Sequence, residues 1–418
     1  MGLLLVLHVL MTRILGAEAY GTYVYIFAWV NVAAILGKFG ADRGVVRLIS
    51  RSISHGDFER IRAHLKWAMG LVAGFTLLAG VLAAAIFALV EGFGHDPVHL
   101  TGAVGLVVLI AVTFSFLQKG ALLGLGAAAT SKIPTEVLRP LFMIGGILVL
   151  AEIVPELGAV DMMWLTLLAY ILVIVLGQVL WHRLYARARL ENPHPGRDET
   201  GAPKLRDFGH FAIVSVSQTV MRYTDVLLIG AIAGPEEVAY YAVAARIVSL
   251  IAFFQRATAP VVQPIISRAY TRGEQDVLRE TVAKTTMVTV VATLAVAAGL
   301  LGFGREVLSL FGPGFDQGTM ILQVLLVGQV VNVFSGPNGV ILSMTDNQNV
   351  AARALWFAAG VNVLGNLALI WQFGALGAAI ATAASVVLWN VLLVWACRVK
   401  LDIDPSVLGA LQFLRKQT

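Results

Sequence analysis

The amino-acid sequence predicts an all-α integral membrane protein with about twelve transmembrane helices in two six-helix lobes of the same topology. Three observations predict this class: the composition, the alternation of long apolar segments with short basic loops, and a segment near the amino terminus that recurs half a chain later. Of the 418 residues, 58% are hydrophobic and 13% are charged, whereas an ordinary soluble domain has about 25% charged residues. The chain therefore has too little polar surface to cover a water-soluble globule.

Eleven segments carry apolar runs suited to crossing the hydrocarbon core, which takes about 20 residues in a helix. We expect spans at residues 20–41, 67–90, 99–118, 137–154, 161–182, 209–232, 238–264, 285–303, 319–343, 350–372 and 375–397. A further segment, MGLLLVLHVLMT, precedes them, but it has only about 12 residues before Arg13, which is too short to span. We therefore expect a truncated first helix, either a stub or the result of a start codon placed too far downstream.

The longest loop, residues 183–208, is basic, contains Pro and Gly, and follows the sixth helix of the twelve-helix count. We predict that it links an amino-terminal six-helix lobe, residues 1–182, to a carboxy-terminal six-helix lobe, residues 209–400. Residues 401–418 are then expected to form a cytoplasmic tail. The external loops are all short, so we expect no soluble domain.

The positions of Lys and Arg predict the orientation, because cytoplasmic loops of membrane proteins carry an excess of both. If the amino terminus is cytoplasmic, the cytoplasmic segments hold 24 of the 30 basic residues and the external loops hold only Arg13 and Arg305. We predict a multi-pass protein of a bacterial cytoplasmic (inner) membrane with both termini in the cytoplasm. The net charge of +5 comes from short loops between spans, so nucleic acid is not an expected partner.

A segment of the first lobe is repeated in the second. RILGAEAYGTYVY at residues 13–25 aligns with part of IAGPEEVAYYAVAARI at residues 232–247 when the sequence is shifted by 218 positions. The following residues coincide in the two copies: Gly16 with Gly234, Glu18 with Glu236, Tyr23 with Tyr241, Lys38 with Arg256 and, after a one-residue slip, Gly56 with Gly273. Six helices separate the copies, so both halves have the same topology. Transporters built from such parallel repeats bind substrate between their halves and move them alternately, which favours a transporter over an enzyme.

Charged and polar side chains inside the spans lie on helical stripes. Such charges are costly in a membrane and usually face a bundle interior or a water-filled cavity. In three spans the spacing of polar residues places them on one face: Asn31 and Lys38; Ser215, Gln218, Arg222 and Asp225; and Arg246, Ser249, Arg256 and Gln263. The repeat aligns Lys38 with Arg256, so two related helices carry a cation at the same depth.

These stripes predict a water-filled central cavity with cationic walls and an anionic substrate. A diphosphate is the natural candidate, because the planar fork of Arg matches phosphate oxygens and Lys serves as a point charge. Asp225 is expected either to pair with Arg222 or to serve a coupling cation or proton.

Purely structural interpretations remain open for several of these residues. Arg222 and Asp225 are three residues apart and can simply neutralise each other. Lys38 lies near the cytoplasmic end of its helix and can extend to the lipid headgroups. Pro260, Pro264 and the sequence SGPNG at residues 335–339 break helices that either line a cavity or bend for structural reasons alone.

Several kinds of site find no support in the sequence. There is no Walker motif, so ATP does not drive the chain directly, and no Cys/His cluster has metal-ligand spacing. We expect no bound cofactor. Three modes of operation stay open: proton-coupled, sodium-coupled and uncoupled.

Several segments, in this order and spacing, resemble the Wzx-type polysaccharide flippases of the multidrug/oligosaccharidyl-lipid/polysaccharide (MOP) superfamily, whose fold is also that of the MATE transporters. They are TRILGAEAYGTYVY, TDVLLIGAIAGPEEVAYYAVAARIVSLIAF at residues 224–253, PVVQPIISRAYTRGE and GALGAAIATAASVVLWN at residues 374–390. The resemblance covers nearly the whole chain and implies a twelve-helix, two-lobe transporter that moves undecaprenyl-diphosphate-linked oligosaccharides to the external leaflet. It also implies that Arg13, Asp225 and the cavity cations match polar positions of the family. The chain departs from the family in its short first helix and at Ala239, where Gly is usual.

The expected substrate-binding residues are therefore Arg13, Asn31, Lys38, Gln218, Arg222, Arg246 and Arg256, with Asp225 as the ion-coupling candidate. The expected partners are a lipid-linked oligosaccharide, membrane lipids and proteins of polysaccharide polymerisation and assembly. The main alternative is a drug/cation antiporter of the same superfamily, which would favour acidic cavity residues. A polysaccharide polymerase or ligase is less well supported, because the chain lacks a large external loop.

Overall fold

The computed structural model describes residues 2–91, 97–191 and 206–417, although several side chains between residues 206 and 221 are left out. In this described part every regular element is a helix. The chain divides into two compact units, Met1–Leu227 and Leu228–Thr418. This division lies inside a helix, whereas the predicted linker was the loop 183–208.

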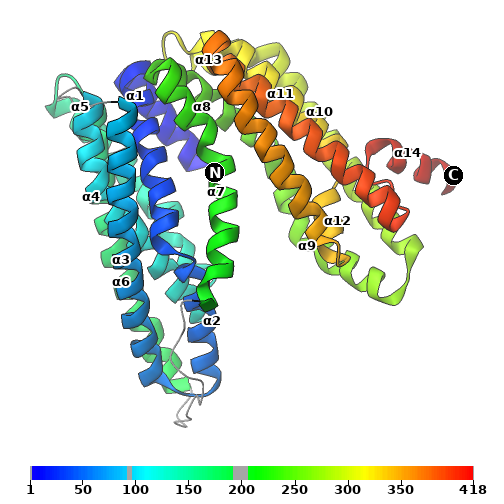
Figure 1. The fold of residues 1–418 in the computed structure, drawn as a ribbon, viewed down its shortest axis with the longest axis horizontal. Coiled ribbons are helices and arrows are strands. Elements are labelled where there is room, and N and C mark those ends of the chain that lie inside the picture. Colours follow the sequence, from blue (N-terminus) through cyan, green and yellow to red (C-terminus); the bar gives the residue numbers. More distant parts are fainter. Residues whose placement is uncertain (1, 92–96, 192–205, 418) are drawn as a thin grey trace. The chain divides into compact units, whose positions relative to one another are not determined.

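The first unit consists of long helices that run roughly side by side (Figure 1). They are α1 (Gly2–Lys38), α2 (Ala41–Ser54), α3 (Phe58–Glu91), α4 (Pro97–Gly124), α5 (Arg139–Ile153), α6 (Ala159–Glu191) and most of α7 (Arg206–Ala233). α2 and the beginning of α3 lie at one end of this unit, and the turn between α5 and α6 lies at the other. Short helical turns at Thr130–Lys132 and Pro134–Leu138 lead into α5.

The second unit contains α8 (Pro235–Ser249), α9 (Ala252–Arg272), α10 (Gln275–Ser309), α11 (Thr319–Phe334), α12 (Asn338–Met344), α13 (Gln348–Leu401) and α14 (Val407–Gln417). α13 has 54 residues and a break at Gly374, where φ is 55° and ψ is −137°. A helix of that length would measure about 80 Å, far more than the roughly 30 Å of a hydrocarbon core. α13 therefore represents two successive spans.

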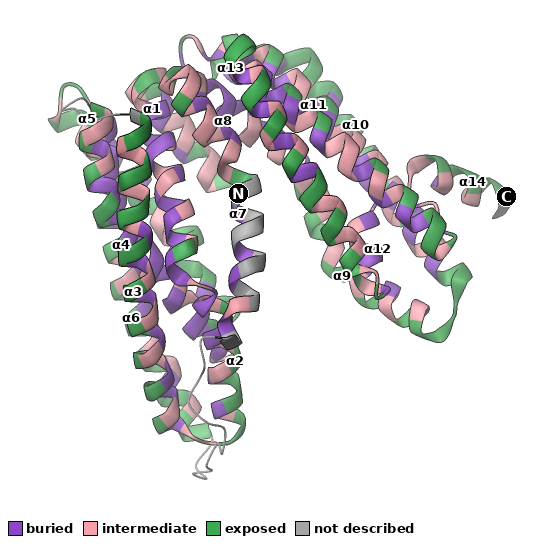
Figure 2. Cartoon of the chain, in the orientation of Figure 1, coloured by how far each residue is buried: buried purple, intermediate pink, exposed green. Residues whose placement is uncertain are grey.

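All eleven predicted spans fall on helices, which confirms the predicted all-helical membrane class. Within the described residues, seven helices are long and apolar enough to cross a bilayer, and the bent pair α8 and α9 adds an eighth. Two of the predicted spans share α13, and the span 319–343 falls on α11 and α12, which are separated by the predicted break at SGPNG. Exposed residues on the outer sides of the helices contrast with buried ones on the sides that pack together (Figure 2).

The predicted repeat is present in the backbone. Gly16 divides α1 with φ 75° and ψ −179°, and Gly234 separates α7 from α8 with φ 92° and ψ 173°. Only glycine adopts this region of the backbone map readily. The segment that recurs in the two lobes is thus a sharp turn between two helices, and the glycine is required at its corner.

The repeat also extends to hydrogen bonds. After α2 the amides of Gly56 and Asp57 donate to the carbonyls of Ile53 and Ser52, and after α9 the amides of Gly273 and Glu274 donate to those of Tyr270 and Ala269 in the same pattern. Such paired bonds, with a left-handed glycine, satisfy the last carbonyls of a helix.

A tyrosine–threonine pair joins two helices in each unit. The hydroxyls of Tyr23 and Thr166 lie 3.0 Å apart between α1 and α6, and those of Tyr241 and Thr382 lie 3.3 Å apart between α8 and α13. The duplication therefore fixes the packing of equivalent helices as well as their turns.

The segment after α13 folds back onto the second unit. Thr286 of α10 donates to the Pro405 carbonyl at 3.0 Å, and Arg279 contacts Asp402 at 2.7 Å. Burial alone would raise the pKa of Asp404, but hydrogen bonds from Ser406 and Arg398 outweigh it and hold this pKa below its ordinary value. The predicted tail is thus a docked helix, α14.

Candidate functional site

Lys38 ends α1 at a sharp break between α1 and α2. Phe39 and Gly40 follow it with φ of 43° and 73°. The Lys38 side chain is buried; its Nζ lies 2.6 Å from the Asp42 carboxylate and 4.9 Å from the centre of the Phe116 ring of α4. The sequence predicted a cavity cation at this position, and the structure adds a carboxylate that neutralises its charge and an aromatic face that contacts it.

Arg256, the repeat partner of Lys38, has a different environment. It is exposed on α9, and its Nη2 donates to the Ser249 carbonyl at 2.8 Å. Ser249 ends α8, and the chain bends by 42° between α8 and α9, which brings a residue seven positions away into reach. The position aligned with Asp42 is Pro260, so the carboxylate partner is absent from the second copy. The two copies therefore share a cation at this position, and the carboxylate that pairs with it is found in the first copy alone.

Arg246 lies in the last turn of α8 and is half-buried. Its Nε is buried and has no hydrogen-bond partner among the described residues. A buried donor without an acceptor is costly, and a guanidinium donor binds anions strongly. Of the predicted cations, Arg246 therefore has the geometry most suited to an anionic ligand.

The remaining predicted site residues lie on α1 and α7. Arg13 is exposed on the first part of α1. Asn31 is buried, and its side chain donates to the Phe27 carbonyl one turn earlier at 2.6 Å. On α7, Arg222 is exposed and Asp225 is 6% exposed, so the two residues differ in environment despite their spacing. The side chain of Gln218 lies outside the described residues.

Arg139 is the third residue of the predicted span 137–154, was counted with the cytoplasmic basic residues, and was not among the predicted cavity cations. It begins α5 and is half-buried. Its Nη1 donates to the Tyr170 hydroxyl of α6 at 2.8 Å, its guanidinium lies 5.1 Å from the centre of that ring, and its Nε is buried without a partner among the described residues. Tyr170 is eleven residues inside α6, about 16 Å along the helix. Arg139 is thus a membrane-depth cation that resembles Arg246 in its unsatisfied Nε.

A chain of amides joins four helices of the second unit and was also missed. Asn338 Nδ2 donates to Asn390 Oδ1 at 2.9 Å, Asn390 Nδ2 donates to Asn332 Oδ1 at 3.0 Å, and Asn332 Nδ2 donates to Gln255 Oε1 at 3.1 Å. It connects α12, α13, α11 and α9 at the break between α11 and α12. The SGPNG motif was the only signal in the sequence, because amides distant in the chain show no periodicity. Satisfied buried networks of this kind fix a unique packing.

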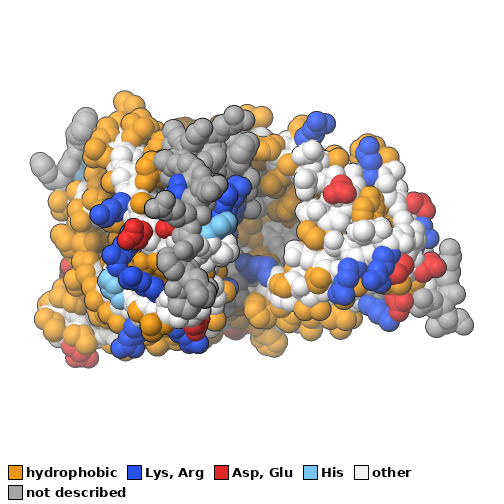
Figure 3. Space-filling model, turned by 90° about the horizontal axis from the view of Figure 1, so that it is seen from below, with side chains coloured by type: hydrophobic (Ala, Val, Ile, Leu, Met, Phe, Trp, Pro, Cys, Tyr) orange, Lys and Arg blue, Asp and Glu red, His pale blue; other side chains and the backbone are white. Residues whose placement is uncertain are grey.

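Arginines also line one face of α2. Arg43, Arg47 and Arg51 are exposed four residues apart, while Val45 and Ile49 on the other face belong to a core with Ile61 and Phe208. Figure 3 shows basic side chains gathered on the face of each unit that is seen from below. In the described part of the chain, no three His, Cys, Asp or Glu side chains gather so as to hold a metal ion.

Comparisons with known proteins identify the class first. The fold is that of the MOP superfamily: a MATE-family multidrug transporter in its inward-facing conformation has a TM-score of 0.74 at 16% identity and covers 100% of this chain and 96% of its own. The lipid II flippase MurJ in an inward closed conformation has a TM-score of 0.69 at 12% identity over 95% of this chain and 85% of its own. The chain thus has the fold of these multi-pass membrane transporters.

The family follows from the sequence comparisons. A family model described as "Polysaccharide biosynthesis protein" matches residues 1–270, so the chain belongs to that family, and a MatE model matches residues 211–368. The probable low-salt glycan biosynthesis flippase Agl15 of Haloferax volcanii is 24% identical over 89% of this chain and 75% of its own length. An uncharacterized membrane protein of Methanocaldococcus jannaschii is 22% identical over 90% of this chain and 76% of its own. The resemblance noted in the sequence is thus confirmed.

Proposed function

We propose that this protein moves a lipid diphosphate-linked oligosaccharide from the cytoplasmic to the external leaflet by alternating access. The observation that carries the proposal is a half-buried arginine at the end of an apolar helix whose buried Nε has no partner among the described residues, found at Arg246 and again at Arg139. Phosphate oxygens would supply the missing acceptors. Membership of the polysaccharide biosynthesis family supports a glycan as the group that the phosphate carries.

The proposed orientation has both termini in the cytoplasm. It rests on the placement of 24 of the 30 basic residues in one set of loops. The named relatives are archaeal, and the bacterial inner membrane stays a prediction of the sequence. Asp225, buried in α7, is the proposed site of coupling to a proton or a sodium ion.

The breaks in the helices supply the moving parts of this proposal. Gly16, Gly234 and Gly374 each divide long helices with backbone angles that other residues avoid, and α8 bends toward α9 next to Arg246. Hinges of transporters are a few residues at element ends that absorb the change in backbone angle. The half of α13 after Gly374 is held at its start by the Glu237 carboxylate, which accepts the Ala375 amide proton at 2.8 Å.

The test is complementation of a bacterium that lacks its own polysaccharide flippase, scored by glycan displayed on the cell surface. We expect the wild-type chain to restore display and Arg246→Ala to reduce it about tenfold or more, because a hydrogen bond to a charged group contributes roughly 1.5–3 kcal/mol. Arg187→Ala is the matched control, since Arg187 is exposed and, within the described part of the chain, pairs with Glu191 of its own helix. Equal display with Arg246→Ala and wild type, at equal membrane levels, would refute the role of Arg246.

A drug/cation antiporter is the second candidate, supported by the MatE model that matches residues 211–368. It would bind cationic compounds, for which acidic groups are needed, whereas the described spans carry more arginines than carboxylates. Drug susceptibility of the same strains separates the two functions: resistance that depends on Asp225 without glycan display would favour the antiporter.

A further inference from the structure

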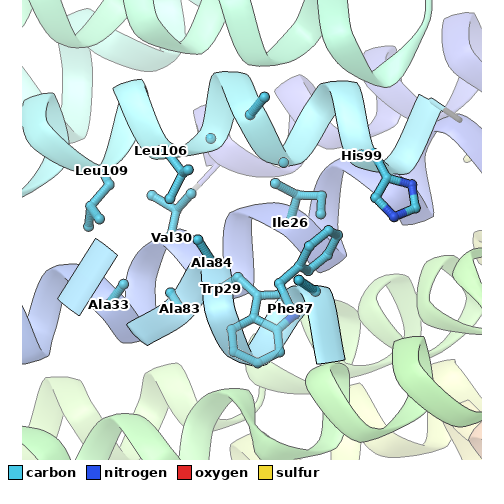
Figure 4. Close-up of a pocket in the computed structure, with 14 residues that line it drawn as sticks. Ile26, Trp29, Val30, Ala33, Ala83, Ala84, Phe87, His99, Leu106 and Leu109 are labelled. Carbon is cyan, nitrogen blue, oxygen red and sulfur yellow. The ribbon is translucent and has the colours of Figure 1, made fainter. Parts of the chain in front are cut away.

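A pocket in the first unit opens between α1, α3 and α4 and has no role in the proposed transport cycle. Its volume is about 220 Å³. Ile26, Val30, Leu106 and Leu109 line it together with alanines and glycines, and Trp29 and His99 are the polar-tipped residues among its described lining (Figure 4). None of the described lining side chains is a Lys, Arg, Asp or Glu, so the interior of the pocket suits an apolar ligand.

Small residues create the space. α3 presents Ala83, Ala84 and Ala88 to the pocket, while α1 and α4 touch closely because Gly105 has no side chain. A Cβ at Gly105 would lie 2.9 Å from Ile26 Cγ2. Tight packing of α1 against α4 together with short side chains on α3 leaves a slot on the α3 side.

One end of the pocket is aromatic. Phe87 meets Trp29 edge to face with ring centres 6.3 Å apart and meets His99 at 5.8 Å. Phe87 lies one turn before the end of α3, and His99 lies at the beginning of α4, so this end is at the membrane surface. The Trp29 Nε1 is buried without a hydrogen-bond partner among the described residues, and an indole N–H is a donor suited to the boundary between apolar and wet surroundings.

The length of the pocket matches one leaflet. From His99 to Leu109 the lining follows α4 for ten residues, about 15 Å at 1.5 Å per residue. The hydrocarbon core of a bilayer is about 30 Å thick. The pocket therefore extends from the membrane surface to about the middle of the core.

The pocket is continuous with the lipid-facing surface. Leu106 lines it and is 40% exposed, and Ile110 of the next turn is 64% exposed. On α3 the neighbouring Val81 and Leu82 are exposed in the same way. In a multi-pass membrane protein this surface contacts lipid, so hydrocarbon chains are the molecules that reach the slot.

We propose that this pocket binds one acyl chain of a bilayer phospholipid from the leaflet at which α3 ends and α4 begins. The chain lies along Val30, Leu106 and Leu109, and the Trp29 N–H donates to the ester carbonyl at the surface end. The bound lipid fills the slot beside α1, the helix that ends at Lys38, and holds α1 against α3. This inference does not depend on which substrate the protein transports.

Photo-crosslinking in nanodiscs tests the proposal with two phosphatidylglycerol probes, one with a diazirine near the ester and one with a diazirine near the chain end. We expect the first to label peptides around Trp29 and His99 and the second to label peptides around Ala33 and Leu109. Ala84→Phe, which fills the slot, should abolish this labelling. Ala85→Phe is the matched control, because Ala85 is the next residue of α3 and is exposed.

Ala83→Leu provides a second filling variant if Ala84→Phe does not yield a monodisperse protein. Labelling that is equal in the filled and control variants, or that does not depend on diazirine depth, would overturn the proposal. A polyprenyl phosphate that carries a diazirine provides a competing probe. If it labels the pocket and phosphatidylglycerol does not displace it, the pocket binds the substrate tail, and the phospholipid proposal is overturned.

Discussion

The ion pair of Lys38 with Asp42 gives a quantitative prediction. The side chains are 9% and 21% exposed, and Nζ and Oδ2 are 2.6 Å apart. At an effective dielectric constant of about 20 the attraction is about 6 kcal/mol, most of which offsets the cost of removing both charges from water. Asp42→Ala removes the attraction but leaves a buried ammonium, so we expect it to reduce the free energy of unfolding by about 3 kcal/mol.

Intrinsic tryptophan fluorescence during heating measures this effect, because Trp67 and Trp181 pack against the core that contains α2. A loss of about 3 kcal/mol corresponds to a decrease in Tm of roughly 6–12 °C for a unit of this size. Lys38→Met should reduce the free energy of unfolding by less than Asp42→Ala does, since Asp42 is nearer to the surface. In the double variant the reduction should be smaller than the sum of the two single reductions. Additive losses, or an unchanged Tm for Asp42→Ala, would refute the ion-pair interpretation.

Two further predictions concern the repeat and the docked tail. Replacing either Gly16 or Gly234 with Ala should destabilise its unit by about 1–3 kcal/mol, because both glycines have backbone angles that alanine avoids; equal Tm values in detergent for variant and wild type would contradict this. The pKa of Asp404 is lower in the folded protein than its ordinary value of 3.8, so its contribution to the docking of α14 is complete above about pH 4 and is lost as the pH falls through the lowered pKa. The protection of the α14 amides against hydrogen exchange, relative to the intrinsic exchange rate at each pH, should therefore decrease on acidification in the wild type and be lower already at neutral pH in Asp404→Asn. Identical protection in both proteins would show that Asp404 does not hold the helix.

The sequence predicted the helices well because a membrane span is a local property. About 20 apolar residues must form a helix to satisfy their backbone groups in lipid, so every predicted span lies on a helix. The break at SGPNG and the glycines of the repeat were also visible, since Gly and Pro restrict or free the backbone locally. The bend between α8 and α9 was not visible, because Leu250 and Ile251 carry no such signal.

The site was less predictable because it depends on contacts between distant residues. Lys38 and Arg256 align in sequence, but Phe116 of α4 and the bend after Ser249 determine what each one contacts. Arg139 was counted with the cytoplasmic basic residues because it lies at the very start of the predicted span 137–154, and its contact with Tyr170 places it at membrane depth. Spacing along one helix identifies a face, and it does not identify what the face contacts.

Transport by purified protein tests the central proposal most directly. Proteoliposomes would contain a fluorescent lipid diphosphate-linked oligosaccharide, and an impermeant reductant would report the fraction in the outer leaflet. We expect wild type and Arg187→Ala to equilibrate the substrate between leaflets, and Arg246→Ala and Arg139→Ala to do so at least about tenfold more slowly. A wild-type protein that does not move this lipid, or arginine variants that move it at the wild-type rate, would contradict the account.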